Sequence, residues 1–493
     1  MKETKKMRIF SLGIQHVLAM YAGAILVPLL VGRALNLTAE QLAYLVSIDL
    51  LTCGIATWLQ ARKGKYLGIG LPAVLGSSFV AVTPMIAIGS QYGIPAIYGS
   101  IIAAGLFIVI FAVFFSKIVK LFPPVVIGTV VTIIGLALIP TGIKNMAGGA
   151  NSENFGSLDN LALSFGVLLF ILILNRYARG FVRSLAVLLG IIVGTLIAAI
   201  MGKVNLASVQ EASWFHLPQP FYFGWPTFEI GPIITMIIVG TVVIIESTGV
   251  FMALSKICDQ PINENDLARG YRAEGLAFVL GGIFNAFPYN TFAQNVGLVQ
   301  LSKVKTTNVV VAAGGILVFL GLIPKVAAFA TIIPSAVLGG ATVVLFGMVV
   351  SSGIKMLQNV DFGKQSNLLI VACSVSLGLG VTAVPDLFAQ LPQSIWIIVS
   401  DGIITGSLSA ILLSVFFNLA LKKRELASTT CTGSGSTHLI LVITDMYYGS
   451  KRNRSKMVFW EVECKTMIPL GKETSWIFWC LRFMRNAKGM QIC

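Results

Sequence analysis

Apolar runs long enough to cross a lipid bilayer follow one another through most of the chain as far as residue 420. A helix needs about 20 predominantly apolar residues to span the hydrocarbon core of a membrane. Hydrophobic residues make up 56% of the 493 residues and charged residues only 11%, whereas soluble globular domains carry roughly 25% charged residues. The sequence therefore predicts a polytopic membrane protein and excludes a soluble enzyme, a disordered scaffold and a nucleic-acid-binding protein.

Charged residues, glycine and proline divide these apolar runs into about fourteen candidate membrane spans. We expect them at residues 11–32, 41–60, 68–90, 94–116, 121–142, 161–178, 183–202, 230–254, 270–285, 288–303, 307–324, 329–352, 366–384 and 395–420. Fourteen spans are two sets of seven, and an odd number of spans in each half places the second half upside down in the membrane. An inverted repeat is therefore one arrangement open to this chain.

Basic residues test the number and direction of the spans. With a cytoplasmic N-terminus and strict alternation, the loops expected outside hold only Arg33, Lys144, Lys203 and Lys325, and the other lysines and arginines before residue 425 fall inside. Lys and Arg collect in the cytoplasmic loops of membrane proteins. The distribution therefore supports fourteen spans with both ends cytoplasmic, and it accounts for the net charge of +15 without nucleic acid as a partner.

Two of the expected spans are poor continuous helices. The third contains the glycine- and proline-rich segment 67–72 and the polar segment 76–79, and the tenth contains the segments 287–291 and 294–297. Glycine and proline interrupt helices, and polar residues at bilayer depth face a cavity or a partner helix. Both segments are third in their half, and matching broken segments in two halves point to a transporter binding site.

Ionisable residues inside membrane spans are costly, so each is a candidate for function. Glu246 lies deep in the eighth span, where its carboxylate can accept hydrogen bonds from a flat polar solute or carry a proton; a helix-packing hydrogen bond is the alternative. Glu274 is either a proton-coupling group or a partner of Arg269 or Arg272. Asp49 is expected to make a structural or gating contact rather than bind a ligand.

Polar and aromatic residues beside the broken segments complete the candidate site. His16 in the first span is either a packing residue or a group that orients a carboxylate. Gln294 and Asn295 each present a planar donor–acceptor edge that suits a heterocyclic amide. Phe79 is either a stacking platform for such a ring or part of the apolar core.

The motif beginning Gln294-Asn295-Val296-Gly297 resembles the signature of the nucleobase–ascorbate transporters. Ser302 stands where that family usually has Thr, which keeps the hydroxyl group. The resemblance extends over residues 8–424 and includes Gln15-His16 and the segments 76–79, 246–249 and 272–275. Glu246 together with Gln294 is similar to the bacterial xanthine and uric acid permeases, whereas uracil permeases usually have Glu at the position of Gln294.

The resemblance implies an all-α membrane protein built as a 7+7 inverted repeat, with short antiparallel strands in the third and tenth spans. It implies a core domain at about 8–116 and 230–324 and a gate domain at about 121–202 and 329–420. The implied substrate-binding residues are Glu246, Gln294, Phe79, Ser78, Asn295 and Gly297, and the implied residues for proton coupling or site support are Glu274, His16 and Asp49.

The function implied by the resemblance is proton-coupled import of a purine nucleobase through the bacterial cytoplasmic membrane by a homodimer. Xanthine is the expected substrate and uric acid the near alternative. An anion transporter or channel on the same fold would be favoured by a basic residue near the broken segments, and none occurs between Leu71 and Thr83 or between Phe287 and Leu301. A membrane-embedded enzyme would need a cluster of catalytic groups, but His16 is the only histidine within an expected span.

Residues 425–493 differ in character from the rest of the chain. They begin with the Ser/Thr/Gly-rich segment 427–436, which is typical of a linker, and contain no spanning run. We expect this tail to be poorly ordered and separate from the transporter. Cys53, Cys258 and Cys373 lie far apart without paired spacing, so we expect no metal site, disulfide framework or cofactor.

Overall fold

The computed structural model describes residues 2–118, 123–150, 152–215, 217–358, 360–428, 438–440 and 461–463. The chain divides into two units, Met1–Phe416 and Phe417–Cys493. In the described part of the second unit, strands β3 (His438–Ile440) and β4 (Glu461–Glu463) pair in antiparallel fashion. Most of the tail lies outside the described residues, so its expected lack of order stays a prediction.

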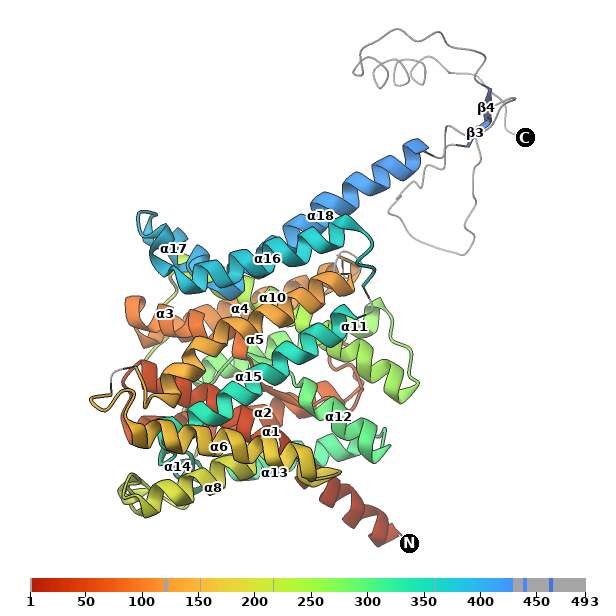
Figure 1. Ribbon diagram of the computed structural model, residues 1–493. Helices are drawn as coiled ribbons and strands as arrows, with labels where there is room; N and C mark the ends of the chain where they lie inside the picture. The colour runs from red at the N-terminus through yellow and green to blue at the C-terminus, as the bar shows by residue number, and fades with distance from the viewer. Residues whose placement is uncertain are drawn as a thin grey trace. The chain divides into compact units, whose positions relative to one another are not determined.

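The first half of the chain, up to residue 229, forms helices that follow the expected spans closely (Figure 1). Their bounds are α1 (Lys2–Ala34), α2 (Ala39–Ala61), the 3-10 helix η1 (Phe79–Ala81), α3 (Val82–Tyr92), α4 (Ile94–Ile118), α5 (Pro124–Met146), α6 (Leu158–Tyr177), α7 (Phe181–Ser184), α8 (Ala186–Ile200) and α9 (Ala207–Glu211).

The second half repeats this succession of long and interrupted helices. Its bounds are α10 (Ile230–Cys258), α11 (Glu264–Ile283), α12 (Ala293–Ser302), α13 (Asn308–Gly321), α14 (Pro324–Thr331), α15 (Ser335–Leu357), α16 (Gln365–Ala383), the 3-10 helix η3 (Pro385–Phe388), α17 (Gln393–Val399) and α18 (Gly402–Ser428).

Two expected spans are more interrupted than the hydropathy pattern predicts, and a third ends in a sharp bend. The chain bends by 81° between α13 and α14, where Pro324 begins the new helix and cannot continue the old one. The segments 183–202 and 395–420 are likewise divided, into α7 with α8 and α17 with α18. Among the described residues, eight helices are long and apolar enough to cross a membrane, or nine with α13 and α14 counted as one bent span. The count of fourteen spans stays a prediction.

Two short strands interrupt the third and tenth expected spans. Strand β1 (Leu75–Ser77) pairs antiparallel with β2 (Tyr289–Thr291), in the register Leu75↔Thr291, Gly76↔Asn290 and Ser77↔Tyr289. A Cβ atom on Gly76 would lie 2.6 Å from the ring of Phe292, so only glycine allows this close approach. Each strand is followed by a short helix, η1 with α3 after β1 and α12 after β2.

The helices pack in matching pairs from the two halves. Helix α4 packs on α11 as α13 packs on α2, and α6 packs on α15 as α16 packs on α5. Both α4–α11 and α2–α13 meet at facing glycines, since a Cβ on Gly105 would lie 2.7 Å from the oxygen of Gly275, and one on Gly54 would lie 2.4 Å from that of Gly314. In each case a helix of one half packs on a helix of the other half, and the equivalent helices make the same contact with the halves interchanged. This is the packing expected of an inverted repeat.

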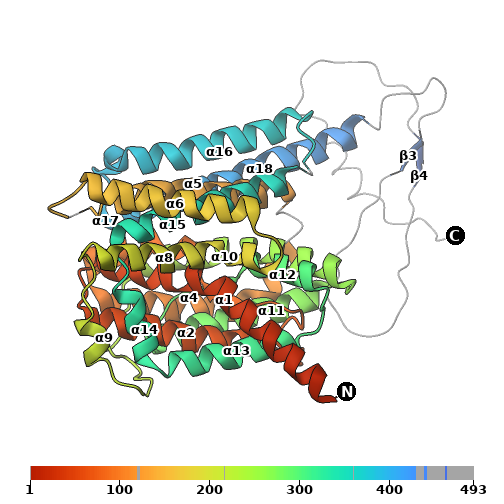
Figure 2. The same ribbon diagram turned by 60° about the horizontal axis from the view of Figure 1, so that its bottom comes forward.

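Two groups of helices are visible in the first unit. Figure 2 shows α5, α6, α15 and α16 lying together, while α1, α2, α4, α11 and α13 lie together on the other side. The strand pair belongs to the second of these groups, because β1 contacts α1 and α2, and β2 contacts α10 and α11. The third and tenth expected spans are therefore held next to one another, although more than two hundred residues separate them in the sequence.

Candidate functional site

The strand pair presents two faces with different partners. Successive side chains of a strand point to opposite faces, so Tyr289 and Thr291 share one face of β2 while Asn290 occupies the other. Ser77 is the cross-strand partner of Tyr289 and lies on the face of Tyr289 and Thr291. The hydroxyl groups of this face meet carboxylates from α2 and α11, and the amide of Asn290 meets a carboxylate from α10.

Glu246 and Asn290 form the polar contact between α10 and β2. The Nδ2 group of Asn290 donates to Oε2 of Glu246 at 2.8 Å. Glu246 is half-buried, whereas Asn290 is 4% exposed and its Oδ1 has no hydrogen-bond partner among the described residues. The two side chains together present a carboxylate and an amide oxygen, both of which accept hydrogen bonds.

Glu274 is fully buried and also holds β2. Its Oε1 accepts a hydrogen bond from the hydroxyl of Thr291 at 2.9 Å, and the backbone N–H of Thr291 donates to Ser247 at 3.3 Å. The alternative that the sequence left open was a pairing of Glu274 with Arg269 or Arg272. The structure instead pairs Arg269 with Asp266, so the Arg269 alternative is wrong.

Asp49 is fully buried on α2, on the strand face that carries Ser77 and Tyr289. One carboxylate oxygen accepts from the hydroxyl of Ser77, and the other accepts from the hydroxyl of Tyr289 at 3.0 Å. The thiol of Cys53 lies 3.9 Å from the first of these oxygens. Asp49 thus makes the structural contact that the sequence favoured, and all these partners are neutral.

His16 and Asn295 connect α1 to the first turns of α12. Nδ2 of Asn295 lies 3.2 Å from Nδ1 of His16 and 3.4 Å from the backbone oxygen of His16. A donating amide requires His16 Nδ1 to be the acceptor, which places the proton of a neutral imidazole on Nε2. Asn295 is 1% exposed and its Oδ1 has no partner among the described residues. His16 therefore orients an amide rather than a carboxylate.

Phe79 packs among aromatic rings from both helix groups. Its ring is parallel to that of Phe292, with centroids 6.5 Å apart, and it meets Phe346 of α15 edge-on at 5.7 Å. Ser78 precedes it, fully buried, and the Ser78 hydroxyl has no partner among the described residues. Gln294 is half-buried at the start of α12. Gly297 is exposed with no atom within 4 Å of where its Cβ would be, so packing in this structure does not require glycine there.

Buried polar atoms without partners gather around the strand pair. Protein interiors pair nearly all such atoms, yet Ser78 Oγ, Asn290 Oδ1 and Asn295 Oδ1 are buried and unpaired within the described residues. Asn290 lies on β2, Ser78 directly follows β1, and Asn295 lies in the first turn of α12, the helix after β2. These atoms, with the carboxylate of Glu246, make a set of acceptors that a ligand rich in N–H groups would satisfy.

Sequence reasoning missed three residues of this cluster, namely Tyr289, Asn290 and Thr291. They stand in the segment 287–291 that marks the tenth span as broken, but no site role was assigned to them. The available signal was the alternation of side chains along a short strand, which places Asn290 opposite its two neighbours. Among the described residues, no group of His, Cys, Asp and Glu could hold a metal ion.

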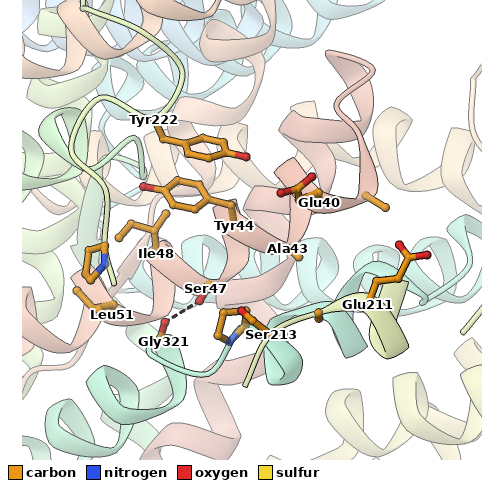
Figure 3. A pocket seen from close by; sticks show the side chains of 14 residues that line it. Glu40, Ala43, Tyr44, Ser47, Ile48, Leu51, Glu211, Ser213, Tyr222 and Gly321 are labelled. Atoms are coloured by element: carbon orange, nitrogen blue, oxygen red, sulfur yellow. Dashed lines mark hydrogen bonds between the residues drawn. The ribbon is translucent and has the colours of Figure 1, made fainter. Parts of the chain in front are cut away.

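A separate cavity of about 420 Å³ lies between α2, the segment 211–222 and the α13–α14 bend. Figure 3 shows the stacked rings of Tyr44 and Tyr222, whose centroids are 3.9 Å apart, and the hydrogen bond from Ser47 to the oxygen of Gly321. Glu40 and Glu211 also line it. None of the candidate site residues does, so this cavity is distinct from the cluster at the strand pair.

Comparison with solved structures identifies the fold. The transmembrane domain of a cyanobacterium bicarbonate transporter, BicA, matches 78% of this chain and 97% of its own with a TM-score of 0.57 at 17% sequence identity. The murine Solute Carrier 26 family member A9 anion transporter in the inward-facing state matches 88% of this chain and 72% of its own with a TM-score of 0.54 at 15% identity. The chain therefore has the inverted-repeat transporter fold, and likenesses at this identity concern the fold alone.

Comparison with curated proteins identifies the family. Uric acid permease PucJ of Bacillus subtilis (strain 168) is 65% identical over 432 residues, which are 86% of this chain and 96% of PucJ. Xanthine permease of the same organism is 58% identical, over 84% of this chain and 95% of its own, and Uric acid transporter UacT of Escherichia coli (strain K12) is 44% identical, over 83% and 86%. The family model Xan_ur_permease, described as a permease family, matches residues 7–387. The chain is a multi-pass membrane protein that belongs to this permease family, the nucleobase–ascorbate transporters.

Proposed function

We propose that the chain is a proton-coupled symporter that imports an oxidised purine, uric acid or xanthine, across the bacterial cytoplasmic membrane. The observation that carries the proposal is the contact between Glu246 and Asn290 beside further unpaired acceptors at Ser78 and Asn295. Purines with several oxo groups carry several ring N–H groups, which these acceptors complement. Their carbonyl oxygens would face the amide N–H groups of the site and the positive N-terminal ends of η1 and α12.

Relatives support an order of substrates to test. PucJ, named as a uric acid permease, is 65% identical to this chain, and the named xanthine permease is 58% identical. Xanthine was the expectation from the site motif alone. Uric acid is therefore the first substrate to test, and xanthine, which differs from it by one oxo group, is the second.

Two carboxylates at the strand pair, one half-buried and one fully buried, support coupling to protons. Glu246 and Glu274 lie on adjacent helices and bind adjacent residues of the same strand, Asn290 and Thr291. Uptake driven by a proton gradient needs a group whose charge changes during the cycle, and carboxylates at membrane depth commonly serve as such groups. The partners of Glu274 in the structure are hydroxyl groups rather than cations, which leaves its charge free to change.

The two helix groups support an assignment of core and gate. We infer that the core, residues 8–116 and 230–324, carries the strand pair and that the gate, residues 121–202 and 329–420, moves against it. The contact of Phe79 with Phe346 joins the two groups, so substrate bound beside Phe79 would lie at their boundary. Both termini are proposed to be cytoplasmic, from the basic loops, and the functional unit is proposed to be a homodimer.

An anion transporter on the same fold is the second candidate. The solved structures that share the fold include anion and bicarbonate transporters, yet likeness at this identity does not extend to the substrate. No lysine or arginine lies in the segments 72–82 and 288–300 that contain the strands. An anion site there would lack a basic side chain, so this candidate is the weaker one.

The deciding experiment is uptake of labelled uric acid and xanthine by a host that lacks its own purine permeases. Unlabelled uric acid, xanthine, hypoxanthine, guanine, uracil and bicarbonate serve as competitors. We expect saturable uptake that uric acid and xanthine inhibit strongly and uracil and bicarbonate do not. Uptake of labelled bicarbonate is measured in the same cells. Saturable bicarbonate uptake, with no purine uptake despite confirmed membrane abundance, would replace the purine proposal with the anion one.

A further inference from the structure

Asp49 and Glu274 occupy equivalent positions in the two halves of the chain. Helix α2 begins with a capping box of Thr38 and Gln41, and α11 begins with one of Asn263 and Asp266. Counted from the capping residues Thr38 and Asn263, the two carboxylates stand at the same place in their helices. Helices α2 and α11 are also the equivalent helices of the repeat, because each packs on the fourth expected span of the other half, α13 and α4 respectively.

Each carboxylate binds the last residue of the strand in its own half. The hydroxyl of Ser77, which ends β1, donates to Asp49, and the hydroxyl of Thr291, which ends β2, donates to Glu274 at 2.9 Å. The antiparallel register makes Ser77 and Thr291 equivalent, since both lie at the same distance from the central pair of Gly76 and Asn290. Two unlike acids thus perform the same contact in the two halves.

Asp49 also makes a contact with β2, the strand of the other half. The hydroxyl of Tyr289, at the start of β2, donates to Asp49 at 3.0 Å and also contacts the hydroxyl of Thr52. Asp49 therefore binds β1 through Ser77 and β2 through Tyr289. It joins the two halves of the chain where β1 pairs with β2.

The position of Asn290 depends on these anchors. Tyr289 and Thr291 flank Asn290 and are bound on one face of the strand by Asp49 and Glu274, while Asn290 is bound on the other face by Glu246. A strand fixed on both sides of one residue leaves that residue little freedom. Functional groups need support of this kind to hold their geometry.

We propose that Asp49 is a positioning residue of the purine site, which acts through Ser77 and Tyr289 and touches no substrate. This inference rests on the proposed function. Asp49 sets the relative position of the strands, and thereby the place of Ser78 after β1 and of Asn290 in β2. Replacement of one Asp49 carboxylate oxygen, as in Asp49→Asn, therefore changes substrate affinity and selectivity more than it changes the amount of folded protein.

The test compares Asp49→Asn, Tyr289→Phe and the double variant in the uptake assay, with KM, Vmax and membrane abundance measured for each. Hydrogen bonds to charged groups contribute about 1.5–3 kcal/mol, so we expect KM to rise about tenfold or more. Tyr289→Phe removes the hydroxyl that contacts Asp49 and Thr52 and leaves the bond from Ser77 to Asp49 in place. Its effect should not add to that of Asp49→Asn. The ranking of purine competitors should change in both variants.

The matched control is Asp401→Asn. Asp401 is another buried carboxylate, 6% exposed, whose Oδ1 accepts from the N–H of Ile404 at 2.8 Å in the first turn of α18. Among the described residues it makes no hydrogen bond to either strand. Asp401→Asn should therefore leave KM and the competitor ranking unchanged.

Three results separate this inference from the proposed function. Absence of purine uptake by the unmodified chain at normal abundance contradicts the proposed function itself. Wild-type KM and competitor ranking in Asp49→Asn and Tyr289→Phe, with transport intact, overturn only the role of Asp49. If Asp49→Asn does not reach the membrane, Tyr289→Phe and Ser77→Ala decide, and lower Vmax with unchanged KM in both overturns the inference.

Discussion

Asn290 donates a hydrogen bond to Glu246 from the central position of a three-residue strand, while both of its strand neighbours are held by acids on the opposite face. The amide thereby fixes one oxygen of a carboxylate that lies at membrane depth and is only half-buried. One oxygen of the Glu246 carboxylate is thus fixed, and Oδ1 of Asn290, which has no partner among the described residues, lies on the neighbouring side chain. Together they can accept further hydrogen bonds from a defined direction. The predictions that follow test this arrangement.

Replacement of Glu246 by Gln should weaken purine binding more than tenfold. The amide removes the charge that strengthens a hydrogen bond from a ring N–H group, a loss of roughly 1.5–3 kcal/mol. KM for uptake is the measurement, with membrane abundance determined in parallel. Glu229→Gln, at the exposed start of the same helix, is the control that should behave as wild type. Uptake by Glu246→Gln at wild-type affinity would remove Glu246 from the site.

Asn290→Ala and Asn290→Asp should both impair uptake, and the aspartate variant should be worse. Alanine removes the donor to Glu246. Aspartate places a carboxylate oxygen where the donor now lies, 2.8 Å from Oε2 of Glu246, and like charges at such a distance repel strongly. We expect KM to rise about tenfold for Asn290→Ala. Asn154→Ala in an exposed loop is the control. Equal KM values for all three variants would contradict the assignment of Asn290.

His16→Ala should reduce uptake affinity through Asn295 rather than by itself. The imidazole accepts from the Asn295 amide and so fixes where Oδ1 of Asn295 points. The neutral hydrogen bond contributes about 1 kcal/mol, which predicts a KM increase of roughly fivefold. The double variant with Asn295→Ala should be no worse than Asn295→Ala alone. Additive effects of the two substitutions would show that His16 acts independently.

Asp266 lies at the start of α11, ahead of the expected span 270–285. Its ionisation should make the free energy of unfolding depend on pH. Burial raises the pKa of its carboxyl, but the N–H of Asn263 and the charges of Lys63 and Arg269 lower it more, so the pKa lies below its usual value. A lowered pKa adds stability above the usual carboxyl value of about 3.9, and that stability is lost as the pH falls through the folded-state value.

Asp266→Asn should therefore lower the thermal unfolding midpoint of the detergent-purified protein at pH 7, by loss of the ion pairs and of half the capping box. The capping contribution alone is about 1 kcal/mol. The difference from wild type should narrow below about pH 4. Asp386→Asn, an exposed carboxylate, should show no difference at either pH. If the difference in unfolding midpoint between Asp266→Asn and wild type stays the same at low pH, the electrostatic explanation is contradicted.

A stop codon after Arg424 should leave purine uptake and membrane abundance essentially unchanged. The relative PucJ is matched over 96% of its length by 86% of this chain, so a complete permease of this family does not need a tail of this length. Uptake by cells that express the truncated and full-length chains is the comparison. Loss of transport in the truncated chain, with normal transport in the full-length chain, would make the tail part of the functional protein.

Hydropathy and charge predicted the helical part of the fold well, because each membrane helix is set by its own sequence. Helices α2, α4 and α10 begin and end within a few residues of their expected spans. The bend between α13 and α14 was not predicted, since the segment 307–324 is apolar up to Pro324. Its direction depends on the packing of α14 against α2, which a local pattern does not contain.

The sequence predicted several residues of the candidate site, but not which of them bind one another. Glu246, Glu274 and Asn295 were found because polar groups in apolar spans are costly and therefore rarely accidental. The pairings of Glu246 with Asn290 and of Asp49 with Tyr289 depend on the register of two strands from different halves. Tertiary packing fixes this register, so the sequence of one half alone does not predict which residues of β1 and β2 lie opposite each other.

The pairing of β1 with β2 has a consequence for how the protein is made. Synthesis of the first half leaves β1 with backbone N–H and C=O groups that have no strand beside them until residues 289–291 have been added. A membrane interior offers such groups no alternative partner, and closing so long a loop is slow compared with forming local helices. The helices of the first half can therefore insert early, but the site is completed only when the second half arrives. Neither half expressed alone would contain a finished site.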